Sequence, residues 1–339
     1  MRIVLDAMGS DDHPEPELQA AVEIAARWQE PLLLVGPQDV LQPRLDAAGV
    51  PHDRVRVIHA PEVLKMTDKP ARAARGKAKS SMAVGMHLIK DGEADAFVTA
   101  GNTGGALANA LFILGRIRGV KRPPLAAMVP AKNGHIITLD IGANADCKPE
   151  YLVQFAVLGS VYAETALGKK KPRVGLLSNG EEPGKGNTLV KETFPLLEKA
   201  DIHFLGNVEP KEAFAGVVDV VVMDGFTGNV FIKASESVSS FLISMIREEI
   251  QASPLTTIGG LLARPAFRNV RKILDPAETG AAPLLGIKGL VFVGHGRSDA
   301  RALVNAVRAT RQAVEHDLLD ALQKAIQTRL SDRKMGGAT

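Results

Sequence analysis

The chain has 339 residues, of which 45% are hydrophobic and 23% charged, and its net charge is +3. This length and composition are typical of a soluble globular protein with one large domain or two closely packed ones. Because the net charge is small, the chain lacks the strong overall positive potential that would attract a polyanion. The aromatic content of 4% argues against base-stacking surfaces, so no nucleic-acid partner is expected.

Cysteine usage and hydropathy indicate the compartment. The single cysteine, Cys147, excludes an intrachain disulfide framework and a cysteine-based zinc site, and it fits a reducing cytoplasm. The first residues form a strand pattern rather than a signal peptide. No apolar run approaches the roughly 18 residues of a membrane span. We therefore expect a cytoplasmic protein whose membrane contact, where it has one, is peripheral.

Short apolar runs alternate with helical patterns along most of the chain. Strands are predicted at residues 2–7, 31–36, 55–59, 96–98, 125–129, 135–141, 173–177, 202–205 and 219–223. Helices are predicted up to about residue 28 and at 38–48, 80–91, 149–167 and 231–251. A further apolar stripe consists of Val314, Leu318, Leu322, Ile326 and Leu330. The alternation predicts an α/β protein with a mostly parallel, doubly wound sheet, followed by a flexible tail at residues 332–339.

The stretch of residues 94–111, ADAFVTAGNTGGALANAL, organises this pattern. A buried strand breaks at the glycine-rich segment 101–105 and the chain resumes as a helix of small residues. Glycines at such a turn let backbone N–H groups approach an anion, and the helix N-terminus adds partial positive charge. The structural alternative is a tight turn that needs glycine only for its backbone angles.

Six predicted strand ends are followed by polar loops that contain glycine. They are DAMGSD (6–11), AGNTGG (100–105), DIGANADCKPE (140–150), SNGEEPGKGNT (178–188), DGFTGN (224–229) and GHGRSD (294–299). The carboxyl ends of parallel strands lie on one edge of a sheet, so these loops are predicted to line a cleft.

The side chains of these loops suit an anionic, polar ligand. Asparagines orient such a ligand without adding charge, and lysines supply cations for phosphate. The candidates are Asn102, Thr103, Gly104, Asn144, Asp146, Lys148, Lys185, Asn187, Asp224, Asn229 and His295. The alternatives are solvated lysines, aspartates that cap turns or helices, and a structural hydrogen bond for His295. No spacing of carboxylates or histidines makes a metal site the stronger interpretation.

Several familiar motifs are absent. The GKGNT segment lacks the spacing of a Walker loop and the third glycine of a dinucleotide fingerprint, and there is no GxSxG elbow. Cys147 stands near a predicted helix start, where a thiolate is stabilised, but a lone cysteine is more often an inert small hydrophobe.

Residues 253–285 differ in character from the rest. The segment LTTIGGLL is apolar but too short to span a bilayer, and its Leu255, Ile258, Leu261 and Leu262 are candidates for membrane contact. Arg264, Arg268, Arg271 and Lys272 follow at the spacing of one helical face. Such a face suits anionic lipid or an acidic protein, or it is the solvated side of an ordinary amphipathic helix.

Together, the motifs resemble those of a known family. DAMGSD, SSMAVG, AGNTGGALA, DIGANADCKPEYLVQFA, GLLSNGEEPGKGN, DVVVMDGFTGNV and GRSDARALVNAV, between residues 1 and about 325, resemble the PlsX family of acyl-acyl-carrier-protein:phosphate acyltransferases. The chain departs from the family pattern in three places: Ser10 stands where glycine is usual, GRSD replaces GSSD, and Ser178-Asn179 replaces an asparagine–isoleucine pair.

The resemblance implies a three-layer α/β/α fold of the kind shared by phosphotransacetylases and isocitrate-dehydrogenase-like enzymes. Residues 1–331 would form one catalytic domain of two intimate lobes, with an amphipathic insertion at about 253–285. It also implies a homodimer, peripherally attached to the cytoplasmic membrane, that turns acyl-carrier thioester and inorganic phosphate into acyl phosphate without metal or redox cofactor. A membrane glycerol-3-phosphate acyltransferase would use the product.

Within the matched motifs, residue chemistry suggests roles. Lys185 and Asn187, with Asn102 and Thr103, are expected to bind phosphate and the oxyanion; Asn229 and Asp224 to orient the thioester or the phosphate proton; and Asn144, Asp146 and Lys148 to form the opposite wall. The basic face of residues 264–272 is expected to dock the acidic carrier protein. The alternatives are a coenzyme A-dependent phosphotransacylase and a non-enzymatic membrane scaffold that recruits the carrier protein.

Overall fold

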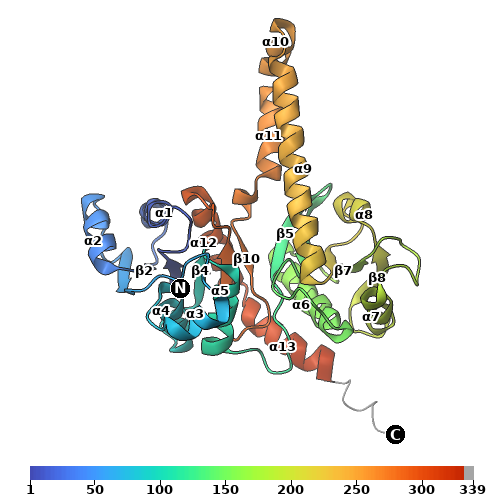
Figure 1. The fold of residues 1–339 in the computed structure, drawn as a ribbon, viewed down its shortest axis with the longest axis horizontal. Coiled ribbons are helices and arrows are strands. Elements are labelled where there is room, and N and C mark those ends of the chain that lie inside the picture. Colours follow the sequence, from blue (N-terminus) through green and yellow to red (C-terminus); the bar gives the residue numbers. More distant parts are fainter. Residues whose placement is uncertain (332–339) are drawn as a thin grey trace.

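A computed structural model describes residues 1–331, and the tail predicted at 332–339 lies outside the described residues (Figure 1). The strands are β1 Ile3–Asp6, β2 Leu32–Gly36, β3 Val55–His59, β4 Ala96–Thr99, β5 Ala126–Ala131, β6 Gly134–Leu139, β7 Arg173–Leu177, β8 His203–Val208, β9 Val220–Val222, β10 Ala281–Pro283 and β11 Leu290–Gly294.

The helices alternate with these strands. They are α1 Glu15–Arg27, α2 Gln38–Ala47, α3 Pro70–Gly76, α4 Ser81–Lys90, α5 Thr103–Asn109, α6 Pro149–Leu167, α7 Thr188–Glu198, α8 Pro210–Ala215, α9 Gly225–Gln251, α10 Pro254–Leu262, α11 Arg264–Leu274, α12 Ala300–Glu315 and α13 Leu318–Ser331. A π-helical turn, Ala110–Leu114, continues α5, and a 3-10 turn, Pro276–Glu278, precedes β10.

The strands form two sheets, where the sequence pattern had indicated one. The first has the order β10-β11-β4-β1-β2-β3 and the second the order β5-β6-β9-β7-β8. All neighbours are parallel except the pairs β10–β11 and β5–β6. The prediction of a mostly parallel α/β architecture is therefore confirmed. Each sheet makes one lobe of the molecule.

Helices cover both faces of the first sheet. Ile3 and Leu5 of β1 point into a hydrophobic cluster shared with α1 and α12. Val4 between them points into a second cluster with Met82 and Met86 of α4. Successive residues of a strand face opposite sides, so a fully buried strand such as β1 must be covered on both. The result is the three-layer arrangement predicted from the sequence.

The second sheet is also covered on both faces. Leu139 and Val220 pack against α6, where Gly159 is needed because a Cβ there would lie 2.8 Å from both side chains. On the other face, Val221 joins a smaller cluster with Ala213 of α8 and Phe231 of α9. Since α6 is buried over most of its length, it forms the central layer between this sheet and α13.

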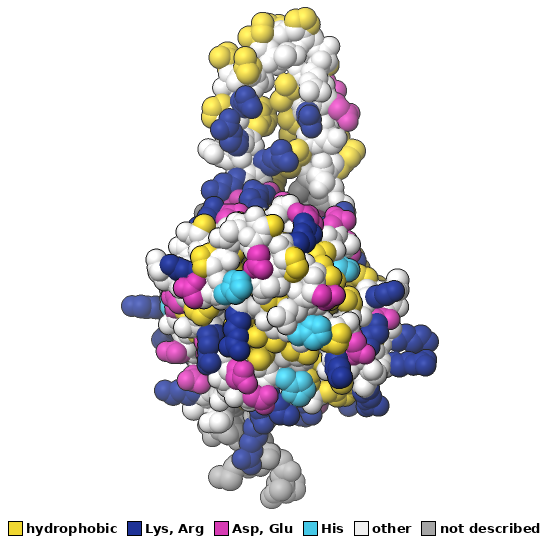
Figure 2. Space-filling view, turned by 90° about the vertical axis from the view of Figure 1, so that its left-hand side faces the viewer, with side chains coloured by type: hydrophobic (Ala, Val, Ile, Leu, Met, Phe, Trp, Pro, Cys, Tyr) yellow, Lys and Arg dark blue, Asp and Glu magenta, His cyan; other side chains and the backbone are white. Residues whose placement is uncertain are grey.

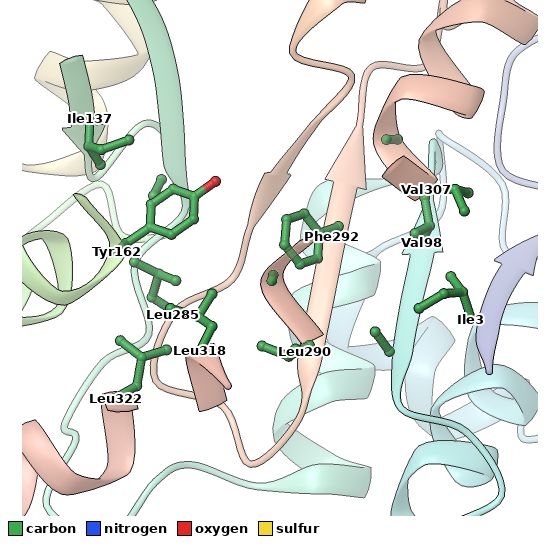
Figure 3. Packing of buried hydrophobic residues seen from close by; sticks show 14 of the residues in the cluster. Ile3, Val98, Ile137, Tyr162, Leu285, Leu290, Phe292, Val307, Leu318 and Leu322 are labelled. Carbon is green, nitrogen blue, oxygen red and sulfur yellow. The ribbon is translucent and has the colours of Figure 1, made fainter. Parts of the chain in front are cut away.

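One hydrophobic cluster joins the two lobes. It contains Phe292 of the first sheet, Ile137 of the second, and Tyr162 and Leu285 between them (Figure 3). Burial raises the pKa of the Tyr162 hydroxyl. A core shared in this way holds the two lobes together.

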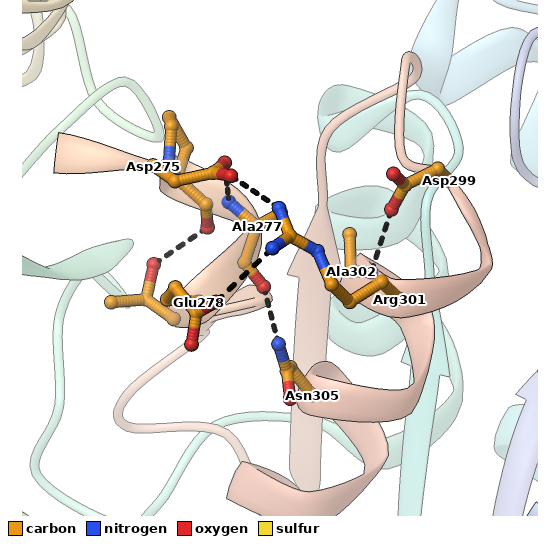
Figure 4. A network of polar contacts seen from close by, with 9 residues as sticks. Asp275, Ala277, Glu278, Asp299, Arg301, Ala302 and Asn305 are labelled. Carbon is orange, nitrogen blue, oxygen red and sulfur yellow. Dashed lines mark hydrogen bonds and ion pairs between the residues drawn. The ribbon is translucent and has the colours of Figure 1, made fainter. Parts of the chain in front are cut away.

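Helices α9, α10 and α11 stand out from this body as a long arm (Figure 1). The insertion predicted at residues 253–285 covers α10, α11 and β10, whereas α9 forms the other leg of the arm. One leg, α9, starts at the edge of the second sheet. The returning leg is tied to the first lobe, because Arg301 of α12 forms ion pairs with Asp275 and Glu278, and Asn305 Nδ2 donates to the Ala277 carbonyl at 2.7 Å (Figure 4).

Two helix predictions need correction. The stripe from Val314 to Leu330 spans two helices, because α12 ends at Glu315 and Asp317 adopts a positive φ of 50° before α13 begins. The helix predicted from Phe231 starts earlier, at Gly225, where the Asp224 carboxylate caps the Thr227 N–H at 2.9 Å. Two glycines in the first turn, which have low helix propensity, conceal this start in the sequence.

Candidate active site

The order of strands places four of the predicted loops at two points where α/β sheets commonly bind ligands. In the first sheet the chain runs from β1 outward to β3 and then returns to the other side of β1 as β4. In the second sheet it runs from β7 to β8 and returns as β9. Ligands of open α/β sheets bind beyond the carboxyl ends of the strands at such switch points. The loops DAMGSD and AGNTGG flank the first point, and SNGEEPGKGNT and DGFTGN flank the second.

Three loops meet at the edge of the first sheet. A Cβ on Gly9 would lie 2.9 Å from the backbone nitrogens of both Ala100 and Gly101, so only glycine permits this approach. The Asp11 N–H donates to the Gly296 carbonyl at 2.7 Å. The loops after β1, β4 and β11 are therefore in direct contact, as the parallel topology predicted.

Buried side chains support these loops from below. The Thr99 hydroxyl donates to Asp6 Oδ2 at 2.7 Å, and Thr99 Oγ1 accepts the Gly101 N–H at 3.0 Å. Asp6 Oδ1 also accepts the Met8 N–H at 3.0 Å. Burial raises the pKa of Asp6, although these hydrogen bonds oppose the shift. Asp6 and Thr99 thus couple the first two loops.

Asn102, a predicted phosphate ligand, uses its side chain within the protein. Its Oδ1 accepts the Gly105 N–H at 2.9 Å as the cap of α5, and its Nδ2 donates to the Met66 carbonyl at 2.8 Å. Thr103 and Gly104 follow at the half-buried start of the helix. Within residues 1–331 the Thr103 hydroxyl makes no hydrogen bond, so it is free to meet a ligand.

At the edge of the second sheet, the loop after β6 is built around Asp140. This buried carboxylate accepts the N–H groups of Leu125, Gly142, Ala143 and Asn144 at 2.7–3.1 Å. It also accepts the Asn144 side-chain amide at 2.8 Å, and the same amide donates to the Pro123 carbonyl. Asn144, predicted to be part of a binding wall, therefore fixes the shape of that wall.

The first turn of α9 packs tightly on this loop. The Gly225 N–H donates to the Asn144 carbonyl at 2.8 Å, and a Cβ on Gly228 would come within 1.9 Å of the Asp140 carbonyl oxygen. Asn229 lies over Gly142, and its half-buried side chain makes no hydrogen bond to any described residue. Two predicted site residues, Asn144 and Asn229, are thus brought together, and the Asn229 amide is available to a ligand.

A groove of about 550 Å³ opens beside Asn229. Its lining comes from the β6 loop and from one face of α9: Gly142, Ala145, Gly225, Phe226, Asn229, Val230, Lys233, Ala234 and Ser237. The lining residues up to Asn229 lie in the two predicted loops, whereas Val230, Lys233, Ala234 and Ser237 were missed because the adjoining part of α9 was not connected with the site. The capping aspartate at 224 is the signal that could have extended the helix to them.

Lys185 and Asn187 lie on the neighbouring loop, between β7 and α7. Asn187 Oδ1 accepts the Val190 N–H at 3.0 Å as the cap of α7, and its Nδ2 remains available. The exposed Lys185 has no ion pair within the described residues, and its stem lies against Gly180. Among those residues, the longer-range side-chain contacts of this loop are to Asn207 and, through Glu181, to Lys211, and none of them reaches another of the predicted loops. The convergence of Lys185 with Asn229 stays a prediction.

The remaining candidates lie on the surface of these loops. Asp146, Lys148 and His295 are exposed, and in the described part of the chain none of their side chains has a hydrogen-bond or ion-pair partner. Burial raises the pKa of the Cys147 thiol to about 12. Because the thiolate is the reactive form, this shift argues against Cys147 as a nucleophile. Residues 1–331 contain no cluster of three or more acidic, histidine or cysteine side chains fit to hold a metal.

The loop after β6 also contacts the first lobe. Ile141 and Ala143, from the loop after β6, pack against the first-lobe cluster that includes Ala106 of α5. The loop at the edge of the second sheet is therefore packed against the first lobe.

Comparison with known proteins identifies the family. Residues 1–320 match the family model described as "Fatty acid synthesis protein". Over 331 residues, covering 97% of this chain and 96% of the relative, the sequence is 45% identical to the phosphate acyltransferase of Pelotomaculum thermopropionicum. The chain belongs to the phosphate acyltransferase family. The phosphate acyltransferase of Elusimicrobium minutum is 44% identical over 327 residues and 96% of both chains.

These matches confirm the PlsX resemblance and an enzyme of the phosphate acyltransferase type. Among solved structures, the EutD phosphotransacetylase from Staphylococcus aureus matches with a TM-score of 0.58 at 16% identity, over 93% of this chain and 94% of that one. A branched-chain phosphotransacylase from Enterococcus faecalis matches with a TM-score of 0.57 at 15% identity, over 93% and 100%. At such low identity these matches establish the fold, which is the one predicted for phosphate acyltransferases.

Proposed function

We propose that this phosphate acyltransferase transfers the acyl group of acyl-[acyl-carrier protein] to inorganic phosphate. The products are acyl phosphate and free carrier protein, and the activity serves membrane phospholipid synthesis. The observation that carries the proposal is the placement of glycine- and asparagine-rich loops at the switch points of both sheets. Such loops present backbone N–H groups and neutral amides to an oxyanion.

The reaction needs no strong base. A phosphate oxyanion attacks the thioester carbonyl, a tetrahedral oxyanion forms, and the carbon–sulfur bond breaks to release the carrier thiolate, which then takes up a proton. Holding two reactants in attack geometry supplies up to about 7–11 kcal/mol of the barrier. One oxyanion donor contributes roughly 3–4 kcal/mol.

Free polar groups of the site fit these tasks. The Lys185 ammonium and the unpaired Asn187 Nδ2 group are assigned to phosphate and the developing oxyanion, together with Thr103 and the backbone of Gly104. Asn229 orients the thioester, and Asp224 holds the helix turn that carries Asn229 through its bonds to Thr227. Lys148, Asp146 and His295 are assigned to substrate binding, and Lys148 adds positive charge to the loop after β6.

The groove beside Asn229 suits the acyl thioester. Phe226 and Val230, with exposed fractions of 67% and 53%, give it an apolar floor, and Lys233 offers a cation at its side. Exposed apolar side chains in a groove indicate a binding site for an apolar ligand. Here they would contact the acyl chain or the pantetheine arm.

The arm is assigned to carrier protein and membrane. Arg264, Arg268, Arg271 and Lys272 are exposed on α11 and have no acidic partner within the described residues, so they are available to an acidic carrier protein. Binding of this kind weakens as salt rises.

The tip of the arm is apolar. Leu255, Ile258, Leu261 and Leu262 of α10 are 60–80% exposed, and Figure 2 shows hydrophobic side chains at the tip above a band of Lys and Arg. Within residues 1–331, no helix has both the length and the apolar character required for a transmembrane span. The tip is therefore proposed to insert peripherally into the cytoplasmic membrane, where a glycerol-3-phosphate acyltransferase receives the product.

The exposed apolar face of α9 favours a homodimer. Val238, Phe241, Leu242, Met245 and Ile246 are 44–62% exposed along one side of the arm. These side chains form a continuous apolar surface rather than scattered single residues. A second copy that packs against this face would remove that surface from water.

The experiment is an incubation of the protein with an acyl-carrier thioester and labelled inorganic phosphate. Labelled acyl phosphate and free carrier thiol should appear in equal amounts. Formation of labelled product from acyl-coenzyme A but not from the carrier thioester would favour the phosphotransacylase alternative. Absence of label transfer from either substrate would refute the proposed reaction and favour the scaffold.

A further inference from the structure

Behind the DAMGSD loop lies a buried carboxyl group that the proposed reaction does not use. Glu17 of α1 has an exposed fraction of 0%, and its Oε1 accepts the Ser10 N–H at 2.8 Å. Its second oxygen and the Ser10 hydroxyl are both buried without a geometrically satisfactory partner in the described part of the chain. A buried carboxyl that is only partly satisfied costs stability, and such a group calls for an explanation.

Ser10 occupies a central place in the loop. Its N–H is held by Glu17, and its carbonyl lies 2.6 Å from His13 Nδ1. The next residue, Asp11, donates to the Gly296 carbonyl, and the preceding one, Gly9, touches the backbone of Gly101. A shift of Ser10 would therefore move both contacts through which this loop meets the other two.

Glu17 lies on α1, outside the loop whose backbone it binds, whereas Asp6 is itself the first residue of that loop. Asp6 holds Met8 and Thr99, and Glu17 holds Ser10, so two buried carboxyl groups fix consecutive parts of one glycine loop. The Ser10 hydroxyl beside Glu17 coincides with a departure from the family pattern, since position 10 is usually glycine. With glycine there, Glu17 would lack the hydroxyl beside it.

We propose that Glu17 is a positioning residue, which holds the loop of residues 6–11 in the register that phosphate binding at this sheet edge requires. The inference rests on the proposed function, which assigns phosphate to Thr103 and Gly104 of the neighbouring loop after β4, against which the loop of residues 6–11 packs. Glu17 itself is buried beneath the loop and touches no substrate.

The test compares Glu17→Leu, which removes the acceptor, with Glu17→Gln, which keeps an acceptor and loses the charge. Removing a charged partner from a buried N–H should raise the KM for phosphate about tenfold in Glu17→Leu and less in Glu17→Gln. The KM for the acyl thioester should stay within about twofold, because the groove beside Asn229 is in the other lobe. Adding Ser10→Gly to Glu17→Leu should restore part of the phosphate affinity, since it removes the buried Ser10 hydroxyl that has no hydrogen-bond partner.

A matched control is Glu30→Gln. Glu30 follows α1 and pairs with Arg311 at 2.8 and 3.0 Å, at the opposite end of the helix from the loop. This change should lower stability without altering the phosphate KM. The comparison thereby distinguishes a general loss of stability, expected in both variants, from a displacement of the loop, expected only in Glu17→Leu.

Amide hydrogen exchange supplies a readout independent of activity. In Glu17→Leu, the N–H groups of Met8, Ser10 and Gly101 should exchange about tenfold faster, while those of β6 stay unchanged. Should the Leu variant not fold, Glu17→Gln decides by the same measurements. A phosphate KM within twofold of wild type in a folded variant, equal shifts of both KM values, or unchanged loop exchange would each overturn the proposal. A wild type that makes no acyl phosphate would refute the proposed function, and the exchange data would still decide the role of Glu17.

Discussion

Asn229 lies directly over Gly142, so closely that a Cβ atom on Gly142 would come within 3.0 Å of Asn229 Nδ2. In the first turn of α9, Gly225 and Gly228 approach the backbone of the same loop. The first turn of α9 and the loop after β6 thus form a single rigid unit. The groove lined by Gly142, Gly225 and Asn229 begins at this unit, so its geometry depends on glycine at these positions.

Substituting Gly228 should damage the site. A Cβ in Gly228→Ala would lie 1.9 Å from the Asp140 carbonyl oxygen, so α9 or the loop must move. Overpacking of this kind costs about 1–3 kcal/mol, and unfolding in urea should show the loss together with reduced acyl transfer. The matched control is Gly259→Ala in α10, where a Cβ meets open space. Equal stability of both variants would contradict the packing described here.

Removing the Lys185 ammonium should impair phosphate use. Lys185→Ala is expected to lower kcat/KM for phosphate about 100-fold, because an unpaired cation that binds the nucleophile and the oxyanion is lost. The control is Lys211→Ala, since Lys211 lies near the same loop but pairs with Glu181 and Glu209. Steady-state assays with varied phosphate measure both. Wild-type turnover with unchanged phosphate affinity in Lys185→Ala would remove this lysine from the site.

Charges at the tip of the arm should release the protein from membranes. The double variant Leu261→Glu, Leu262→Glu is expected to lose binding to anionic vesicles in a flotation assay while it keeps the reaction in solution. Leu205→Glu is a suitable control, because Leu205 is 46% exposed on β8, outside the arm. Vesicle binding that persists in the double variant would show that another surface makes the contact.

Reversing charges on α11 should weaken use of the carrier protein. Arg268→Glu with Arg271→Glu is expected to raise the KM for the acyl-carrier thioester and to reduce its dependence on salt, since attraction becomes repulsion. The KM for phosphate should not change. Lys90→Glu, an exposed charge on α4, serves as the control. A carrier KM equal to that of wild type would place the docking surface elsewhere.

Stability should fall as the pH rises through neutrality, because of Glu17. Burial raises the pKa of Glu17 from 4.5 to about 7. The folded protein therefore holds this proton more tightly than the unfolded chain. The corresponding contribution to the free energy of unfolding is complete below pH 4.5 and is lost as the pH rises through 7. A shift of this size corresponds to about 3 kcal/mol. Urea unfolding between pH 4.5 and 8 should show this component in the wild type and not in Glu17→Gln. If the free energy of unfolding depended on pH in the same way in both proteins, Glu17 would not be the source of this pH dependence.

Local sequence patterns predicted most of the elements correctly. Strands such as β1 and β4 are short apolar runs that end in glycine loops, and their boundaries follow from that contrast. The division into two sheets could not be predicted, because a parallel strand has the same pattern in either sheet. The start of α9 was missed because Gly225 and Gly228, required for close packing on Asp140, weaken the helical signal.

The sequence located the loops of the candidate site but not their internal hydrogen bonds, and the role of these loops stays a prediction. The loops were found, since glycine and asparagine after a buried strand are visible in the sequence. The use of Asn102 and Asn144 for internal hydrogen bonds was not, because an asparagine that caps a helix or braces a loop has the same neighbours as one that meets a ligand. Glu17 was missed altogether, since nothing in its spacing distinguishes a buried glutamate from an exposed one.

The central claim is that loops from both sheet edges hold inorganic phosphate beside the acyl thioester. A crystal structure of the protein soaked in phosphate tests it most directly. We expect the anion within hydrogen-bond distance of the Lys185 Nζ atom and the loop amides, with Asn229 facing it across the site. Phosphate bound elsewhere, or these loops empty at saturating phosphate, would contradict the account.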